Sequence, residues 1–220
     1  MGVLAVMDAT GTHVASVNLS MIPADKSLDR AVELLSDFTE LNSLDASRTS
    51  FNDEHAAVLG GIQSLNTVTL NDSELTDVGL AHLAKLSKLE ALNVTLTKIS
   101  DAGLGALQES SKLKVLDLSG TKVSGNLAPL VQLPNLTWLA LRNCTLEDNA
   151  LASLASSPSL RQLSLESATV SEVAINRLKV KLPELRVGTG SLAAPPEMPE
   201  TPPSDSSKAE DKSTQPIPGQ

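Results

Sequence analysis

The sequence predicts an α/β solenoid, built from short strand–helix units that repeat about every 24 residues. Three observations lead to this fold class. A leucine pattern recurs along the chain, the spacing of apolar residues changes within each unit, and the composition suits a packed core. Of the 220 residues, 41% are hydrophobic and 20% are charged, which excludes a chain that is disordered throughout.

The recurring pattern is L-x-x-L-x-L. It starts at residues 65, 89, 113, 136 and 160, fits upstream at 14 and 41, and opens a last partial unit at Leu185. The seven intervals between these starts are 27, 24, 24, 24, 23, 24 and 25 residues long, and chance does not keep such a register. We therefore assign residues 14–188 to one repeat array.

Each unit predicts a strand followed by a helix. The first six residues alternate apolar and polar, which is typical of a half-buried strand. The second half spaces its leucines by three, as in Leu80, Leu83 and Leu86, which indicates one face of a short helix. Oxygen-bearing pairs precede the helices and predict helix caps: Asn52–Asp53, Thr76–Asp77, Ser100–Asp101 and Glu147–Asp148. Prolines two residues before a strand pattern end three helices: Pro134, Pro158 and Pro183.

The consensus L-x-x-L-x-L-x-x-[TSC]-x-[ILV]-x-D-x-x-L-x-x-L resembles the leucine-rich repeat family, in particular its short bacterial class. Asn143-Cys144-Thr145 is similar to the cysteine-containing class. The resemblance implies a right-handed horseshoe with parallel strands on the concave face and short helices on the convex face. We expect an internal ladder whose members bond to the backbone of the adjacent turn: Thr49, Ser73, Thr97, Thr121 and Cys144.

The two ends of the array differ from the repeats. Residues 1–13 are expected to supply the outer strand of a capping hairpin, because apolar stretches flank the turn Asp8–Gly11. Residues 189–220 predict a disordered tail, because seven of the twelve prolines fall there among Ser, Glu and Lys.

Motifs for chemistry are missing from the sequence. His13, His55 and His82 fall in different units, are expected at the surface, and have no spacing to cysteine or carboxylate that suits a metal. Cys144 has no histidine in its own or the neighbouring repeats, so we expect a structural role for it. The sequence therefore predicts no enzyme activity, no catalytic residue, no metal site and no cofactor.

Charge and hydropathy restrict the partners. The net charge is −9 and only three residues are aromatic, so we expect no nucleic-acid binding. No apolar run approaches the ~20 residues of a membrane-spanning helix, so we expect no direct membrane insertion and a cytoplasmic location, or else a signal or anchor encoded upstream. Residues 1–76 carry −8 and residues 77–188 carry +2. We expect a monomer, with weak association of these oppositely charged ends as the alternative.

The concave sheet is the predicted binding surface. Because the leucines of the strand pattern point into the core, its third, fifth and seventh positions are expected to face solvent, and most of them are small and polar. One place differs, since Trp138 and Arg142 are of the types most enriched at binding hot spots. The predicted partner-binding residues are Trp138, Arg142, Asp117, Val115, Gln162 and Glu166.

Two interpretations of these residues remain open. In the first, Trp138 and Arg142 contact a partner. In the second, Trp138 lies over Val115 and Arg142 pairs with Asp117 or Glu166, as a surface cluster that contributes little free energy. For the whole chain, the sequence predicts a non-catalytic module that binds a partner protein on the concave sheet. The alternative is a structural scaffold or spacer in a larger or membrane-anchored assembly, tethered through the C-terminal tail.

Overall fold

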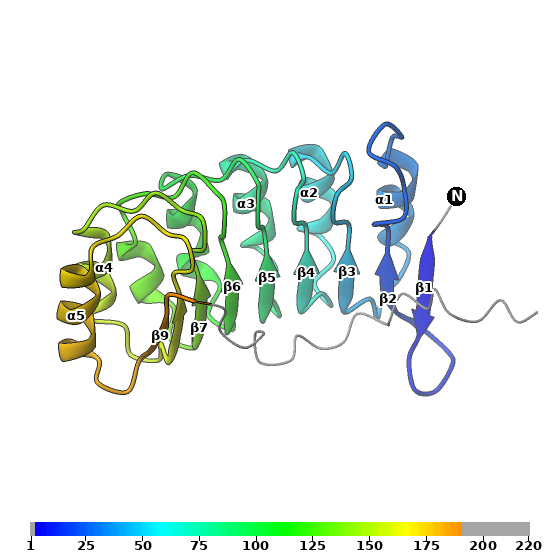
Figure 1. Cartoon of the computed structure of the whole chain (residues 1–220). Coiled ribbons are helices and arrows are strands. Elements are labelled where there is room, and N and C mark those ends of the chain that lie inside the picture. Colours follow the sequence, from blue (N-terminus) through cyan, green and yellow to red (C-terminus); the bar gives the residue numbers. More distant parts are fainter. Residues whose placement is uncertain (1–2, 191–220) are drawn as a thin grey trace, which may run out of the picture.

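Residues 3–190 are described by a computed structural model, in which they form one curved solenoid with a nine-stranded sheet (Figure 1). The strands lie in the sheet in chain order: β1 (Leu4–Met7), β2 (Val14–Asn18), β3 (Ser43–Asp45), β4 (Thr67–Thr69), β5 (Ala91–Asn93), β6 (Val115–Asp117), β7 (Trp138–Ala140), β8 (Gln162–Ser164) and β9 (Arg186–Gly188). Strands β2 to β9 are parallel, and β1 pairs with β2 in the antiparallel direction. The α/β repeat solenoid predicted from the sequence is therefore confirmed.

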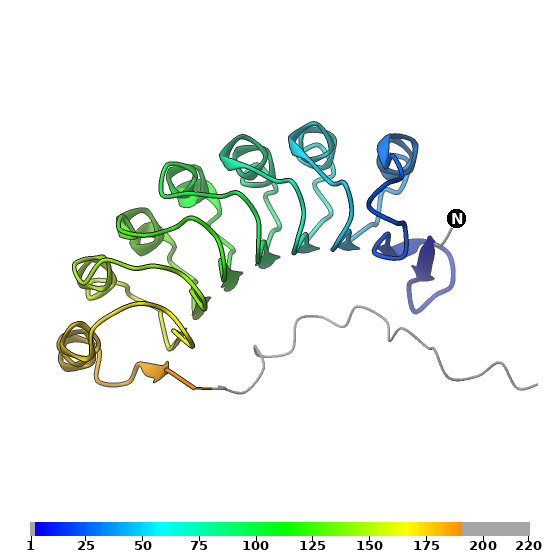
Figure 2. The same cartoon turned by 45° about the horizontal axis from the view of Figure 1, so that its top comes forward.

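Helical turns connect the parallel strands. They are α1 (Asp29–Leu35), α2 (Asp53–Leu59), α3 (Asp77–Leu83), the 3₁₀ helices η1 (Gly103–Glu109) and η2 (Ala128–Gln132), α4 (Ala150–Leu154) and α5 (Glu172–Lys181). Figure 2 shows the helices along the outside of the arc and the strands along its inside. The inner sheet is thus the concave face and the helical layer the convex face.

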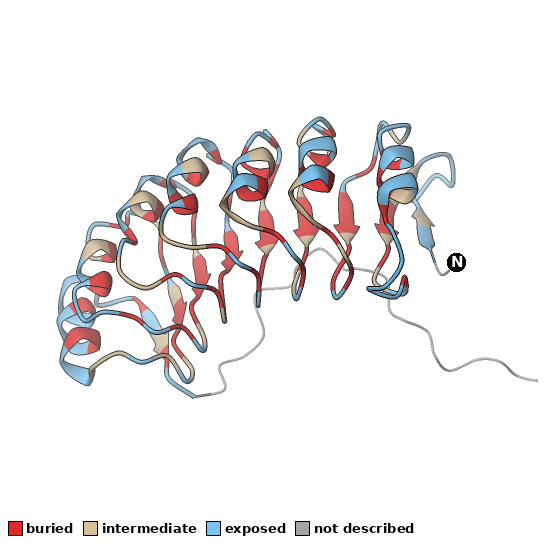
Figure 3. Ribbon diagram, turned by 90° about the horizontal axis from the view of Figure 1, so that it is seen from above, coloured by how far each residue is buried: buried red, intermediate tan, exposed pale blue. Residues whose placement is uncertain are grey.

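The core lies between these two layers (Figure 3). The central residues of β3 to β8 stand side by side in the sheet, and all of them have no exposed surface: Leu44, Val68, Leu92, Leu116, Leu139 and Leu163. A single repeat could not bury such a leucine row, so stacking of neighbouring repeats forms the continuous core.

The predicted helix caps are only partly correct. The side chains of Asn52 and Thr76 do cap α2 and α3. Before η1, the hydroxyl of Ser100 accepts from the backbone nitrogen of Ala102 at 3.3 Å, but Ala102 and Asn149, which directly precede η1 and α4, provide no side-chain cap. The aspartates of the predicted pairs have a different role, because each accepts hydrogen bonds from the next repeat. Asp53 accepts from the backbone nitrogen (2.9 Å) and the hydroxyl (2.6 Å) of Thr76, and Asp77 accepts in the same way from Ser100.

The interior ladder also differs from the expectation. Thr49, Thr97 and Thr121 donate to a carbonyl three residues earlier in their own turn, at 2.6 to 2.7 Å, as threonine hydroxyls commonly do with nearby backbone. The thiol of Cys144 does reach the adjacent turn, at 3.4 Å from the carbonyl of Leu118. The hydroxyl of Ser73 is buried without a hydrogen-bond partner among the described residues. Bonding to the adjacent turn was therefore the wrong expectation for the threonines.

At the N-terminal end, the antiparallel pairing of β1 with β2 puts the predicted hairpin at the edge of the sheet. The predicted disordered tail falls almost wholly outside the described residues, of which Gly190 is the last. Within residues 3–190, none of the helices has the length and hydropathy needed to span a bilayer.

Candidate partner-binding face

The structure brings the six predicted binding residues together at the C-terminal half of the concave sheet. Trp138 lies between Val115 and Gln162 on neighbouring strands, because these residues are direct register partners. Arg142 and Glu166 each lie two residues beyond the end of their strand. Asp117 ends β6 and faces the same side as Val115.

Three of these side chains were expected to be accessible to a partner but are buried. Trp138 is only 5% exposed, Asp117 6% and Val115 8%. Trp138 and Val115 form a small buried cluster with Ala91 and Ala140. The expectation that these positions face solvent is wrong, because adjacent strands lie only about 4.8 Å apart and the large indole packs over its small neighbours.

Arg142 already has an ionic partner in the fold. Its Nη2 atom donates to Oδ2 of Asp117 at 2.7 Å, and its Nε atom donates to the hydroxyl of Ser119 at 3.2 Å. The contacts of Trp138 and Arg142 are thus those of the surface-cluster interpretation, with Asp117 rather than Glu166 as the partner of Arg142. Arg142 remains partly exposed, so it still contributes to the accessible surface.

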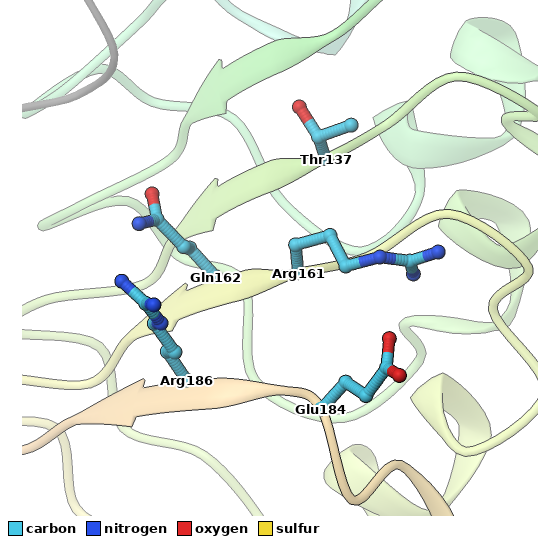
Figure 4. A pocket seen from close by; sticks show the side chains of 5 residues that line it. All are labelled: Thr137, Arg161, Gln162, Glu184 and Arg186. Atoms are coloured by element: carbon cyan, nitrogen blue, oxygen red, sulfur yellow. The ribbon is translucent and has the colours of Figure 1, made fainter.

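Next to this cluster, a pocket of about 300 Å³ opens between β7, β8 and β9 (Figure 4). It is lined by Thr137, Arg161, Gln162, Glu184 and Arg186. Gln162 is half-buried, and Arg161 and Arg186 are exposed. The large polar side chains that a partner could contact therefore gather over the last strands of the sheet.

Arg161 and Arg186 are absent from the set predicted from the sequence. The last unit is one residue out of the predicted register, since Arg186 rather than Val187 pairs with Gln162. Aligning Val187 with the core residue Leu163 would have put Arg186 on the concave face. Arg161 occupies the second position of the strand pattern, which was not among the positions expected to face solvent.

The described residues offer little for catalysis. No group of three or more His, Cys, Asp or Glu side chains within residues 3–190 could hold a metal ion. Cys144 is 1% exposed, and burial raises the pKa of its thiol, which disfavours the nucleophilic thiolate.

The predicted surface position of His55 is wrong. This side chain is buried at the start of α2, where its Nδ1 accepts from the backbone nitrogen of Asn52 at 3.1 Å and its Nε2 lies 2.9 Å from Oδ1 of Asp29. Both ring nitrogens are thus engaged within the fold, so we assign this histidine a role in capping the helix.

Comparisons with known proteins agree with this architecture. A family model described as Leucine Rich repeat matches residues 85–107. The solved structure of internalin C2 from Listeria monocytogenes is similar, with a TM-score of 0.55 and 26% identity over 70% of this chain and 63% of that one. A leucine-rich repeat protein from Leptospira interrogans has the same TM-score at 19% identity, over 70% of this chain and 44% of that one, and shows the fold alone. No curated protein sequence matches this chain. The chain spans less than two thirds of either solved relative.

Proposed function

We propose that this chain, which is similar to leucine-rich repeat proteins, is a non-catalytic module that binds a partner protein on its concave sheet. One observation carries the proposal. The accessible large side chains of the concave face gather over β7 to β9, while the earlier strands present mostly small ones. Long polar side chains around a shallow pocket are better suited to binding a protein surface than to enclosing a small-molecule ligand.

The predicted residues take two roles in this proposal. Arg142, Gln162 and Glu166 are partly exposed and contact the partner. Trp138, Val115 and Asp117 are buried and support the surface, because the indole packs with Val115 and the carboxylate orients Arg142. The proposal thus assigns the binding energy to the rim of the cluster rather than to the indole.

The proposal is tested by blocking the concave face sterically. Gln162→Trp puts a large side chain on β8, and Gln108→Trp puts the same side chain on η1 of the convex layer. Both proteins, checked for equal folding by circular dichroism, are used with the wild type for quantitative affinity capture from native lysate. A protein lost only with Gln162→Trp supports concave binding, and equal captures by all three contradict it.

The scaffold alternative predicts the opposite result in the capture experiment. If the chain is a spacer tethered through its C-terminal segment, capture depends on residues 191–220 and tolerates Gln162→Trp. A chain that ends at Gly190 is therefore included in the same comparison. Capture lost with this shorter chain and kept with Gln162→Trp would favour the scaffold.

A further inference from the structure

The side chains of Gln162 and Arg186 present hydrogen-bond donors that the fold does not use. The two residues are register partners on β8 and β9, and Figure 4 shows their side chains lying next to each other. Within residues 3–190, neither side chain makes a hydrogen bond, and no carboxylate lies within 4.0 Å of Arg186. A guanidinium has five N–H donors and a carboxamide has two, so this pair is rich in unused donors.

The neighbouring cation, Arg142, just after the end of β7, provides a contrast. The guanidinium of Arg142 is neutralised by Asp117 at 2.7 Å, whereas no carboxylate among residues 3–190 lies within 4.0 Å of either arginine of the pocket. Within the described part of the chain, the guanidinium of Arg161 donates only to the carbonyl of Leu160, at 3.1 Å. Among the described residues, the arginines at β8 and β9 therefore lack the direct ionic partner that Arg142 has.

The pocket contains one acid of its own. Glu184 lies on the side toward which Arg161 extends (Figure 4), yet its carboxylate is farther than 4.0 Å from both guanidinium groups. Two arginines and one glutamate leave a formal charge of +1. This balance suits a singly charged oxyanion better than a dianionic phosphate group.

From this geometry we infer that the pocket binds a carboxylate side chain from an acidic segment of the partner, held by Arg186 and Gln162 with Arg161 at the rim. The inference rests on the proposed function, since it names the chemistry of the partner at the same face. The planar fork of a guanidinium matches a carboxylate in two parallel hydrogen bonds. The amide of Gln162 supplies a further donor beside that fork.

The test uses capped hexaglutamate as the probe, with capped hexalysine and a capped peptide carrying one phosphoserine as comparisons. Binding to the full chain is followed by NMR at the side-chain signals of Gln162 and Arg186. Hexaglutamate is expected to shift both signals, and hexalysine neither. Arg186→Ala should weaken hexaglutamate binding at least 5-fold, and Glu184→Gln should strengthen it at least 2-fold because a like charge is removed.

Arg177→Ala is the matched control, because it removes an exposed arginine from α5 at the same end of the solenoid but on the convex layer. It should leave hexaglutamate binding within 2-fold of the wild type. If Arg177→Ala and Arg186→Ala weaken hexaglutamate binding equally, the binding depends only on the overall charge, and the inference is overturned. Unmoved signals, or tighter binding of the phosphoserine peptide, would overturn it as well.

Failure of this inference and failure of the proposed function give different results. A captured protein that is lost with Gln162→Trp but kept with Arg186→Ala would leave concave binding intact and remove the carboxylate site. The opposite result is also possible: the chain binds hexaglutamate, but Gln162→Trp does not change which proteins are captured. That result would support the carboxylate site and contradict concave binding as the function.

Discussion

Asp101 in one repeat accepts two hydrogen bonds from Ser124 in the next, from its backbone nitrogen at 2.9 Å and from its hydroxyl at 3.1 Å. A third comes from the backbone nitrogen of Gly125 at 3.0 Å. The same arrangement joins Asp53 to Thr76 and Asp77 to Ser100. These carboxylates therefore connect successive repeats on the helical side, while the strands connect them on the concave side.

The Asp101 contact predicts a loss of stability in acid. Burial works in the opposite direction, but backbone hydrogen bonds from Ser124, Gly125 and Asn126 hold the pKa of Asp101 below its usual value. A lowered pKa in the folded state contributes stability above the unfolded pKa of about 3.9, and this contribution is lost as the pH falls through the folded value. Asp101→Asn should lower the free energy of unfolding at pH 7 by about 1–2 kcal/mol.

Urea denaturation at pH 7, 5, 4 and 3 measures this effect. The wild type should lose more stability than Asp101→Asn between pH 4 and 3, because the variant has no carboxylate to protonate there. Asp25→Asn, at an exposed loop position, serves as the control. Parallel curves for the wild type and Asp101→Asn would show that the inter-repeat carboxylate adds nothing.

The close approach of Gly79 to Asp53 gives a second prediction. A Cβ atom at Gly79 would fall well inside van der Waals contact with Oδ1 of Asp53 and Cδ1 of Leu75. Gly79→Ala should therefore lower the free energy of unfolding by about 1–3 kcal/mol. Gly105→Ala is the matched control, because a Cβ there meets no atom within 4 Å, and it should be neutral or stabilising by up to about 1 kcal/mol. Equal effects of the two substitutions in urea denaturation would contradict this account.

The buried indole gives a third prediction. Trp138→Ala removes the largest member of the cluster with Val115, so it should destabilise the fold by about 3 kcal/mol. Lys112→Ala, at an exposed position shortly before β6, should change the stability by less than about 0.5 kcal/mol. Thermal and urea unfolding measure both. An unchanged free energy of unfolding in Trp138→Ala would contradict the burial of the indole and would favour its direct contact with a partner.

The single cysteine gives a fourth prediction. Because Cys144 is buried and burial raises the pKa of its thiol, a water-soluble thiol reagent should label the native protein about 100-fold more slowly than the urea-unfolded protein. A Cys144→Ser chain with Ser111→Cys at an exposed position provides the comparison and should react fast in both states. Fast labelling of native Cys144 would reveal an accessible thiol and reopen a chemical role for it.

The repeat period was enough to predict the fold because it depends on leucines that every unit must bury. The side-chain details were not predictable in the same way. The hydrogen bonds that Asp53 and Asp101 accept join residues 23 or more apart, so a local capping pattern does not reveal this contact between repeats. In the turn after the strand, a positive φ recurs at Arg48, Asp72, Leu96, Gly120, Asn143 and Ser167. Glycine adopts this φ freely, and Asn and Asp adopt it more readily than other residues, so the residue type gave no indication of it at Arg48 and Leu96.

The candidate site was predictable in position but not in exposure. The strand register followed from the leucines, so Trp138 and Gln162 could be placed side by side. Whether a side chain on that face is buried depends on its neighbours, and the small side chains of Ala91 and Ala140 leave room for the indole to pack against the sheet. Arg186 was missed because the last unit lacks a second leucine to fix its register.

Binding on the concave face is the central claim, and the affinity of a captured partner for three proteins tests it most directly. Isothermal titration calorimetry would compare the wild type, Gln162→Trp on β8 and Gln108→Trp on η1. Our account predicts binding at least 10-fold weaker for Gln162→Trp and unchanged binding for Gln108→Trp. Unchanged affinity for Gln162→Trp, with or without a loss for Gln108→Trp, would contradict it.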